Sequence, residues 1–427
     1  MTTLHRIVIV GGGAGGLELV TQLGHQLGKT KKAQITLVDQ NLTHIWKPSL
    51  HEIAAGSLNL HEEETNYFAH AAKHHYKFIL GQFTALDSEN KTISIKSTHQ
   101  SKFKGESVDQ IHYDTLVIAI GSNSNDFKTP GVSEHCYFID TPKQAENFHQ
   151  DLLNLYLDAQ HNTTPRALKI AIVGAGATGV ELAAELMQAK TELFKYGLQQ
   201  IDPQQVEISI IEASKRILPA LSEKTAQQTT QQLEKQGIRI LTQHRVSEVT
   251  EESIYFTDGS SLSADLKVWA AGIKAPDVLQ KLENFEKDHL NRLKVYATLQ
   301  TLTDPDVFAF GDCAFCQPVA DEPPLAPRAQ VASQQASFLV KTLKKKIQNK
   351  PLPMFKFSDK GSLISLSHAQ AVGELAANVH VQGAVAKSMY VSLYHLHQAN
   401  IHGYVHAGIL FSKGFLTKKY GPKIKLH

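Results

Sequence analysis

Cysteine is scarce in this sequence of 427 residues. Only Cys136, Cys313 and Cys316 occur, which is too few for a framework of disulfides and fits a reducing compartment such as the cytosol. Long apolar runs are also missing, because none approaches the roughly 18 uninterrupted apolar residues of a spanning helix. No apolar segment with a cleavage site follows Met1. The sequence therefore predicts neither a secretory signal nor a membrane span.

A strong net charge is absent as well. The 43 basic and 41 acidic residues leave a formal net charge of +2, which gives no indication of a nucleic-acid partner. The charge is nevertheless unevenly placed. No carboxylate follows Glu374, whereas six lysines do: Lys387, Lys413, Lys418, Lys419, Lys423 and Lys425. The last segment therefore differs in chemistry from the rest of the chain.

What the sequence does contain is a strand, glycine turn and helix pattern that occurs twice. The first copy has an apolar strand at 7–10 and a second strand that ends at Asp39. Between them lies a GxGxxG turn with Gly11, Gly13 and Gly16. Such a turn offers backbone N–H groups to a pyrophosphate, and the acid accepts hydrogen bonds from ribose hydroxyls. A glycine-rich turn alone can be a plain connection, but its strand, helix and acid together favour dinucleotide binding.

The second copy begins at residue 168, and its second strand ends at Glu212. Its turn has the same spacing, with Gly174, Gly176 and Gly179. An acid at this strand end binds the 2′-hydroxyl of NADH and repels the 2′-phosphate of NADPH, so we expect NADH to be preferred. Lys215 and Arg216 follow closely and either soften that preference or face solvent.

A third block helps to assign the two turns. The short strand within 306–310 ends in Gly311-Asp312, which resembles the second motif of FAD-binding proteins, where the aspartate binds the ribityl chain. Alone, the pair would be an ordinary strand end. With two dinucleotide turns in one chain, one cofactor can hand electrons to another, and the third block assigns the first turn to FAD.

These patterns predict an α/β protein with two Rossmann-like, FAD- and NAD(P)-binding domains and a C-terminal membrane-associating segment. The predicted boundaries are 1–125 for the first part of the FAD-binding domain, 126–290 for the NADH-binding domain, 291–370 for the second part of the FAD-binding domain and 371–427 for a membrane-anchoring region. The polar stretch 158–166 is the predicted linker before the second glycine strand.

Cys313 and Cys316 form a CxxC pair with two functional interpretations. A redox dithiol should lie beside the flavin, soon after the first glycine motif or within the nicotinamide domain, and this pair lies in neither region. A metal site would need two further ligands, and residues 317–327 contain no histidine or cysteine. We therefore expect no metal, and we favour neither role for the pair.

The segment from Met389 onward is aromatic, histidine-rich and basic. Residues 389–401 are at least as well explained by a helix packed on the core as by a membrane contact. Residues 405–427 mix lysines with Ile409, Leu410, Phe411, Phe415 and Leu416 and contain no acid. This mixture predicts an interfacial anchor, in which each lysine near an anionic surface contributes about 1 kcal/mol.

Together these features resemble the type II, non-proton-pumping NADH:quinone oxidoreductases of the glutathione-reductase-like flavoprotein superfamily, especially the bacterial respiratory members. The resemblance covers nearly the whole chain. It lies in IVIVGGGAGGLE, HIWKPSLHEIAAGS, GSNSNDFKTPG, GAGATGVELAAEL, VWAAGIKAPD, FAFGDCA and PRAQVASQQA. The last segment is the most specific, because it matches the family's AQxxxQ quinone-site pattern with Gln330 and Gln334.

The resemblance implies a role for each site residue. It implies that FAD is bound by Gly11, Gly13, Gly16, Asp39, Lys47, Gly121, Gly311 and Asp312, and NADH by Gly174, Gly176, Gly179, Glu212 and Gly272. Glu181 would reach from the NADH domain towards the flavin and nicotinamide, whereas Glu185, one helical turn later, is interpreted as a solvated surface residue. Gln330, Gln334 and Lys360 would lie near the quinone.

The implied activity is hydride transfer from NADH to FAD, followed by reduction of a membrane quinone (ubiquinone or menaquinone) without proton pumping. The implied location is peripheral, on the cytoplasmic face of the inner (plasma) membrane and against an anionic lipid surface, and a homodimer is left open. A first alternative is an FAD-binding scaffold or regulator without activity, against which the intact glycines of both turns count. Two further alternatives belong to the same superfamily. A sulfide:quinone reductase needs reactive cysteines near the flavin, and a soluble FAD-dependent NAD(P)H reductase has no use for the two glutamines or a basic tail.

Overall fold

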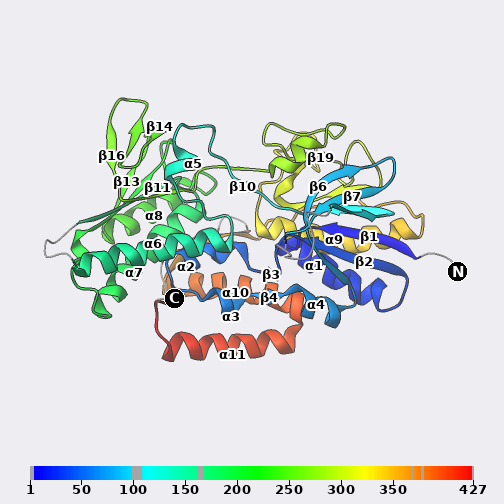
Figure 1. Ribbon diagram of the computed structural model, residues 1–427, viewed down its shortest axis with the longest axis horizontal. Helices are drawn as coiled ribbons and strands as arrows, with labels where there is room; N and C mark the ends of the chain where they lie inside the picture. Colours follow the sequence, from blue (N-terminus) through cyan, green and yellow to red (C-terminus); the bar gives the residue numbers. More distant parts are fainter. Residues whose placement is uncertain (1–3, 99–107, 162–166, 367–368, 377–378, 426–427) are drawn as a thin grey trace.

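Two parallel β-sheets organise the chain, one in each half of the molecule (Figure 1). The computed structural model describes residues 4–98, 108–161, 167–366, 369–376 and 379–425, without the side chains of 108 and 415–420. The first sheet has the order β20 (Val307–Ala309), β9 (Thr115–Ile118), β1 (His5–Val10), β2 (Ala33–Asp39) and β5 (Lys77–Leu80). The second has the order β13 (Ile238–Leu241), β12 (Val206–Ile211), β11 (Leu168–Val173) and β17 (Leu266–Trp269). Neighbouring strands in both sheets are parallel.

In each sheet the glycine turn joins the central strand to a helix. Helix α1 (Ala14–Leu23) follows β1, and α7 (Ala177–Lys195) follows β11. Val10 is in register with Val38 and Ile118, and Val173 with Ile211 and Trp269. The three strands of each unit therefore end at one level, and the predicted α/β architecture with two Rossmann-like units is confirmed.

Two large cores hold these units together. The first surrounds the sheet of β1 and includes Leu339 of α9 (Ala329–Ile347), and Leu279 and Phe285 also pack into it. The second surrounds the sheet of β11 and includes Phe148 of α6 (Pro142–His161). Ile53 of α2 (Leu50–Ala54) belongs to this second core. Ile53, from the predicted FAD-binding domain, and Leu279 and Phe285, from the predicted NADH-binding domain, thus pack in the core of the other unit.

The predicted linker at 158–166 is wrong for its first four residues. Helix α6 continues to His161, and residues 162–166 lie outside the described part of the chain. The helix continues because Leu152, Tyr156 and Ala159 recur on one buried face, whereas the polar residues that suggested a linker belong to its outer face.

Smaller strand pairs and ribbons connect and cover the two units. They are β3 (Thr43–His44) with β4 (Thr65–Asn66), β6 (Gln82–Asp87) with β7 (Thr92–Lys96) and β8 (Val108–His112), β10 (Asn123–Ser124) with β18 (Ile273–Lys274), β14 (Val246–Val249) with β15 (Ser253–Phe256) and β16 (Ser261–Ser263), β19 (Leu293–Val295) with β21 (Ala314–Cys316), and β22 (Gly361–Ser365) with β23 (Ala371–Leu375) and β24 (Val379–Gln382). The remaining α-helices are α3 (Leu60–Glu63), α4 (Tyr67–His74), α5 (Val132–His135) and α8 (Glu223–Lys235).

The C-terminal part forms two helices along one side of the molecule (Figure 1). Helix α10 (Gly383–His402) packs on α1 and on β22 and β23, and it buries His397 and Ile401. The core-packed interpretation of 389–401 is therefore correct. Helix α11 (Tyr404–Tyr420) follows and leaves large apolar side chains exposed. Among the described residues, no helix is both long and apolar enough to cross a bilayer.

The last described residues, 424 and 425, pack against the protein. Ile424 is buried in the second core, and the Lys425 N–H donates to the Gly56 carbonyl at 2.9 Å. The Lys425 carbonyl lies 2.8 Å from Nε2 of His149. This part of the predicted anchor at 405–427 is therefore not available to a membrane, because the chain after α11 returns to α2 and α6.

Candidate active site

The three glycines of the first turn are required for different reasons. Gly11 has φ +98°, and a Cβ there would lie 2.4 Å from the Ala119 carbonyl oxygen. A Cβ at Gly16 would lie 1.9 Å from the Gly11 oxygen. A Cβ at Gly13 would meet none of the described atoms within 4 Å. The first and third glycines thus allow close backbone packing, whereas the second borders open space at the start of α1, where a pyrophosphate fits.

The second turn repeats this geometry. Gly174 has φ +106°, and its Cβ would lie 2.7 Å from the backbone of Ala270. A Cβ at Gly179 would lie 2.0 Å from the Gly174 oxygen, and one at Gly176 would meet no described atom within 4 Å. Each turn therefore has two glycines enclosed by backbone and one beside a space that a dinucleotide can occupy.

The acid at the end of the second strand braces its glycine turn. The Gly12 N–H donates to Oδ2 of Asp39 at 2.7 Å, and the Asn41 N–H to Oδ1 at 2.8 Å. In the second unit the Ala175 N–H donates to Oε2 of Glu212 at 3.0 Å, and the Ser214 N–H to Oε1 at 2.8 Å. Burial raises the pKa of Asp39, and the hydrogen bonds from Gly12 and Asn41 oppose that shift. Oδ1 of Asp39 also accepts the Asn41 side-chain amide at 3.1 Å, so a further lone pair for a ribose hydroxyl remains on Oδ2 of Asp39 and on both oxygens of Glu212.

The carboxyl ends of the two sheets are joined to each other. Gly121 follows β9 with φ +68°, and Gly272 follows β17 with φ +66°. The short strands beyond them, β10 and β18, form an antiparallel pair between the units, with Asn123 opposite Lys274 (Figure 1). In open α/β sheets, ligands bind outside the carboxyl ends of the strands. The pair therefore brings two such binding edges together.

The predicted FAD residues Lys47, Gly121 and Asp312 are brought together around Ser122. The Ser122 hydroxyl donates to Oδ2 of Asp312 at 2.9 Å, and Nζ of Lys47 donates to the Ser122 carbonyl at 2.7 Å. Burial raises the pKa of Asp312, and the Ser122 hydrogen bond and the Lys47 charge oppose that shift. Asp312 is thus held at the end of β20, beside the loop that follows β9.

Sequence reasoning missed Gln335 as well as Ser122. Gln335 is buried, and its Oε1 accepts the N–H of Gly311 at 2.8 Å. It therefore fixes the turn that presents Asp312. The available signal was its place on the apolar face of α9, four residues from Val331 and Leu339, where a polar side chain needs a partner.

Gln330 and Gln334 both bind the segment before β22. The Gln330 amide donates to the Gly361 carbonyl at 2.8 Å and accepts the Lys360 N–H at 3.2 Å. The Gln334 amide donates to the Ser358 carbonyl at 2.8 Å and accepts the Ser358 N–H at 3.1 Å. The Lys360 side chain is exposed. The three residues predicted near the quinone therefore lie together at one end of α9.

Glu181 is buried between α7 and the C-terminal elements. It accepts the Ser365 N–H at 3.0 Å, and its other oxygen lies 3.7 Å from Nδ1 of His51. Burial raises its pKa, whereas His51 and hydrogen bonds from Ser365 and Tyr390 oppose that shift. A carboxyl in this setting can hold a proton at a higher pH than one in water.

The interpretation of Glu185 as a solvated surface residue is wrong. Its side chain is buried, and the Ser57 hydroxyl donates to Oε2 at 2.8 Å. The reason is tertiary: α7 packs against α2 on one side and β22 on another. Two helical faces are therefore covered where the sequence pattern indicated one.

The two cysteines of the CxxC pair are inert in this setting. Cys313 and Cys316 are free and buried, and the Cys313 thiol donates to the Phe310 carbonyl at 3.3 Å. Burial raises the pKa of each thiol to about 12, whereas dithiol chemistry needs a thiolate. In the described part of the chain, no group of three or more His, Cys, Asp or Glu is arranged to hold a metal ion.

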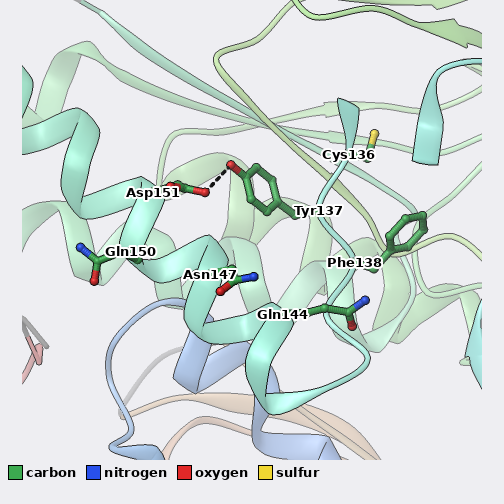
Figure 2. A pocket seen from close by; sticks show the side chains of 7 residues that line it. All are labelled: Cys136, Tyr137, Phe138, Gln144, Asn147, Gln150 and Asp151. Carbon is green, nitrogen blue, oxygen red and sulfur yellow. Dashed lines mark hydrogen bonds between the residues drawn. The ribbon is translucent and has the colours of Figure 1, made fainter. Parts of the chain in front are cut away.

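A cavity of about 400 Å³ lies beside α6, in the second of the two units (Figure 2). It lies between α6 and the segment 136–138, and the Tyr137 hydroxyl donates to Oδ2 of Asp151 at 2.8 Å beside it. Its lining is Cys136, Tyr137, Phe138, Gln144, Asn147, Gln150 and Asp151. These residues include none of the predicted cofactor or quinone residues, so the candidate active site is the edge of the two sheets and not this cavity.

Comparison with known proteins agrees with the geometry. Residues 5–336 match the family model described as pyridine nucleotide-disulphide oxidoreductase. The chain is 39% identical to a type II NADH:quinone oxidoreductase of Haemophilus influenzae, over 99% of this chain and 100% of the relative. It is 28% identical to one of Staphylococcus aureus, over 86% of this chain and 89% of the relative.

Solved structures share the fold. NDH2 from Plasmodium falciparum in complex with NADH has a TM-score of 0.85 at 21% identity, covering 99% of this chain and 100% of that chain. A sulfide:quinone oxidoreductase from Aquifex aeolicus has a TM-score of 0.74 at 16% identity, covering 99% of this chain and 96% of that one. The architecture is therefore common to enzymes with different substrates.

Proposed function

The chain belongs to the pyridine nucleotide-disulphide oxidoreductase family and, within it, to the type II NADH:quinone oxidoreductases, and we infer from this membership that it oxidises NADH through bound FAD and reduces a quinone. The observation that carries the inference is the β10–β18 pair. It joins the carboxyl ends of two sheets, each with its own dinucleotide turn. Two cofactors held at these edges would meet between the units, as direct hydride transfer requires.

We propose that the residues of the first unit hold FAD. The open space beside Gly13 fits a pyrophosphate, Asp39 accepts ribose hydroxyls, and Asp312 with Lys47 accommodates the ribityl chain near Gly121 and Gly311. When bound there, FAD accepts a hydride and passes electrons onward. The protein supplies orientation and exclusion of water.

We propose that the second unit binds NADH through the open side of Gly176 and the carboxylate of Glu212. Glu181 lies on the helix that follows this turn, and its buried carboxyl accepts a hydrogen bond from β22. Its protonatable carboxyl would lie between the NADH side and the segment that Gln330 and Gln334 bind.

The corresponding domain assignment remains 1–125 with 291–370 for FAD and 126–290 for NADH. Residues 275–285 pack in the first core. This packing supports moving the boundary at 290, where the NADH-binding domain ends, towards residue 275.

Glu212→Gln should raise the KM for NADH several-fold and narrow its advantage over NADPH. The amide loses the charge that repels a 2′-phosphate and one acceptor that holds the turn. Steady-state kinetics with both cofactors measure the change. Glu207→Gln, on the exposed face of the same strand, is the matched control. Equal use of NADPH by the unsubstituted enzyme would contradict the role of Glu212.

Gln330→Leu combined with Gln334→Leu should slow the quinone half-reaction by about 30-fold, because two hydrogen bonds worth about 1 kcal/mol each are removed from the 358–361 segment. Anaerobic bleaching of the flavin absorbance by NADH should stay near its normal rate. Stopped-flow mixing of the reduced enzyme with a soluble quinone measures reoxidation.

Ser337→Ala provides the control, since Ser337 is exposed on the same helix. Slow bleaching by NADH together with normal reoxidation would place the quinone elsewhere. Absence of any quinone-driven reoxidation in the unsubstituted protein would refute the proposed acceptor itself.

The sulfide:quinone alternative receives less support. It requires a reactive thiol beside the flavin, and burial raises the pKa of Cys136, Cys313 and Cys316 to about 12. A soluble reductase is disfavoured by the exposed apolar side chains of α11. The 39% identity over nearly the whole of both chains favours the NADH:quinone activity.

We propose that α11 attaches the protein to the anionic, cytoplasmic face of the membrane. Tyr404, Val405, Ile409 and Phe411 are 81%, 83%, 60% and 50% exposed, and such a cluster on one helix marks an interaction site. The described residues after β23 carry lysines and no acid. The docked end at Ile424 holds the far end of this helix against the protein, so α11 can lie flat on an interface.

Replacing Val405, Ile409 and Phe411 with serine should weaken binding to anionic lipid vesicles by about 100-fold, because burial of each apolar side chain contributes about 1 kcal/mol or more. Flotation at low and high salt measures the binding. High salt should partly release the unsubstituted protein by screening the lysines.

Val319→Ser with Tyr255→Ser is the control, since both residues are exposed but lie on other elements. Unchanged flotation of the triple variant would contradict the anchor. A change in oligomeric state without any vesicle binding would assign the same surface to a homodimer.

A further inference from the structure

A buried chain of hydrogen bonds connects α10 to the FAD turn. Glu18 Oε1 of α1 lies 2.8 Å from Nδ1 of His397, Nε2 of His397 lies 3.0 Å from Nε2 of His44, and Nδ1 of His44 lies 3.0 Å from the Gly12 carbonyl oxygen. Glu18, His44 and His397 are 1%, 4% and 2% exposed. Glu18 and His397 are 379 positions apart in the sequence, and His44 and His397 are 353 positions apart. Only the folded chain therefore brings these residues into contact.

The series of three hydrogen bonds contains one hydrogen more than two neutral imidazole rings supply. The Gly12 carbonyl can only accept, so Nδ1 of His44 carries a hydrogen. The contacts at Glu18 and between the two rings each need one hydrogen as well. Three contacts therefore need three hydrogens, and each neutral imidazole brings one. The third belongs to the Glu18–His397 pair, either as an imidazolium beside a carboxylate or as a carboxylic acid.

Loss of this proton would place two nitrogen lone pairs against each other. Burial lowers the pKa of His44 well below its usual value, and the neighbouring His397 adds to that shift, so the proton is held on the Glu18–His397 side. Trp46 lies against the His397 ring with centroids 4.2 Å apart, and Ser333 donates to the other oxygen of Glu18 at 2.7 Å. These contacts keep both partners in place.

We propose that His397, from the C-terminal helix, is a positioning residue for FAD: through His44 it fixes the Gly12 carbonyl and thereby the turn that holds the pyrophosphate. The proposal rests on the assignment of FAD to the first unit. It also couples the helix that precedes α11 to the cofactor. The Gly12 carbonyl has a second donor, the Tyr67 hydroxyl at 2.7 Å, and the Gly12 N–H is held by Asp39, so the peptide group is fixed on both sides.

Other titratable groups lie around the Glu18–His397–His44 series and bear on how its hydrogen bonds depend on pH. They are Asp39 at the end of β2, Tyr67 and His70 of α4, and His402 of α10. Burial lowers the pKa of His70 and of His402 to about 4, and burial raises that of Tyr67. His70, His402 and Tyr67 therefore stay neutral between about pH 6 and about pH 9.

The test is the rate of FAD release from the full-length holoenzyme, followed by the fluorescence of free FAD after dilution between about pH 6 and about pH 9. The three contacts need the extra hydrogen, so we expect their contribution to be lost when a rise in pH removes it. Release should therefore accelerate with pH. His397→Phe keeps a ring against Trp46 but removes both nitrogens, and it should release FAD about tenfold faster at low pH, with little further change.

Glu18→Gln separates positioning from a general structural effect. The glutamine oxygen can accept the Ser333 hydroxyl while its amide donates to His397, which supplies the third hydrogen without an ionisable proton. This variant should hold FAD at high pH as firmly as at low pH. Gln398→Leu removes a neighbouring buried polar side chain of α10 that bonds Tyr394 instead, and it should behave like the unsubstituted protein.

Three results would overturn the proposal: equal release rates for His397→Phe and the unsubstituted enzyme, an unchanged pH dependence in Glu18→Gln, or fast release from Gln398→Leu. Circular dichroism of each variant separates loss of FAD from unfolding. Absence of FAD from the unsubstituted protein would instead refute the proposed function.

Discussion

Gly176→Val is expected to slow reduction of the flavin by NADH by at least about 100-fold, because the added side chain fills the space that the NADH pyrophosphate needs and displaces the nicotinamide from its reacting position. The protein itself has room for the substitution. Gly176 has φ −73° and ψ −172°, which valine adopts readily, and a Cβ there meets none of the described atoms within 4 Å. The variant should therefore fold and keep its FAD.

Anaerobic stopped-flow bleaching at several NADH concentrations measures this effect. Dithionite should still bleach the flavin, and a soluble quinone should still restore the colour, because neither step uses the second turn. Bleaching by NADH at the normal rate would show that the nicotinamide cofactor binds elsewhere.

Gly13→Val is expected to yield folded but colourless protein. Gly13 has φ −61° and ψ −170°, and its Cβ also meets no described atom within 4 Å. Overpacking a closely fitted site costs about 1–3 kcal/mol, which lowers FAD affinity by about 5- to 150-fold. The ratio of flavin absorbance to protein absorbance after purification, and titration with added FAD, measure the loss.

The two valine variants are each other's controls, since the same substitution is made at the same position of two equivalent turns. Gly13→Val should still bind NADH, which protein-detected calorimetry can follow without flavin. A Gly13→Val protein that retains FAD, or a Gly176→Val protein that loses it, would contradict the assignment of the two turns. Unfolding of either would contradict the open space beside these glycines.

The amino-acid sequence by itself determined the two Rossmann-like units and most of the candidate site. The close-packed glycines of both turns can be predicted from the local sequence, because the strand before each turn and the helix after it determine the path of the backbone. They are Gly11, Gly16, Gly174 and Gly179. Asp39 and Glu212 follow from the end of the next strand, since parallel pairing places it beside the turn. Gln330 and Gln334 came from resemblance alone, and in the structure both side chains bind the segment 358–361.

Only the tertiary structure decided which polar side chains are buried and with what partner. Glu185 is covered because α2 and β22 enclose α7, and Ile424 returns to the second core from the far end of the chain. The Glu18–His397–His44 series joins residues more than 350 positions apart. Periodicity reports which face of one helix is apolar, but it carries no information about which distant element covers the other faces. The folded chain alone supplies those contacts, because burial of a polar group is tolerated only where a partner from another element satisfies it.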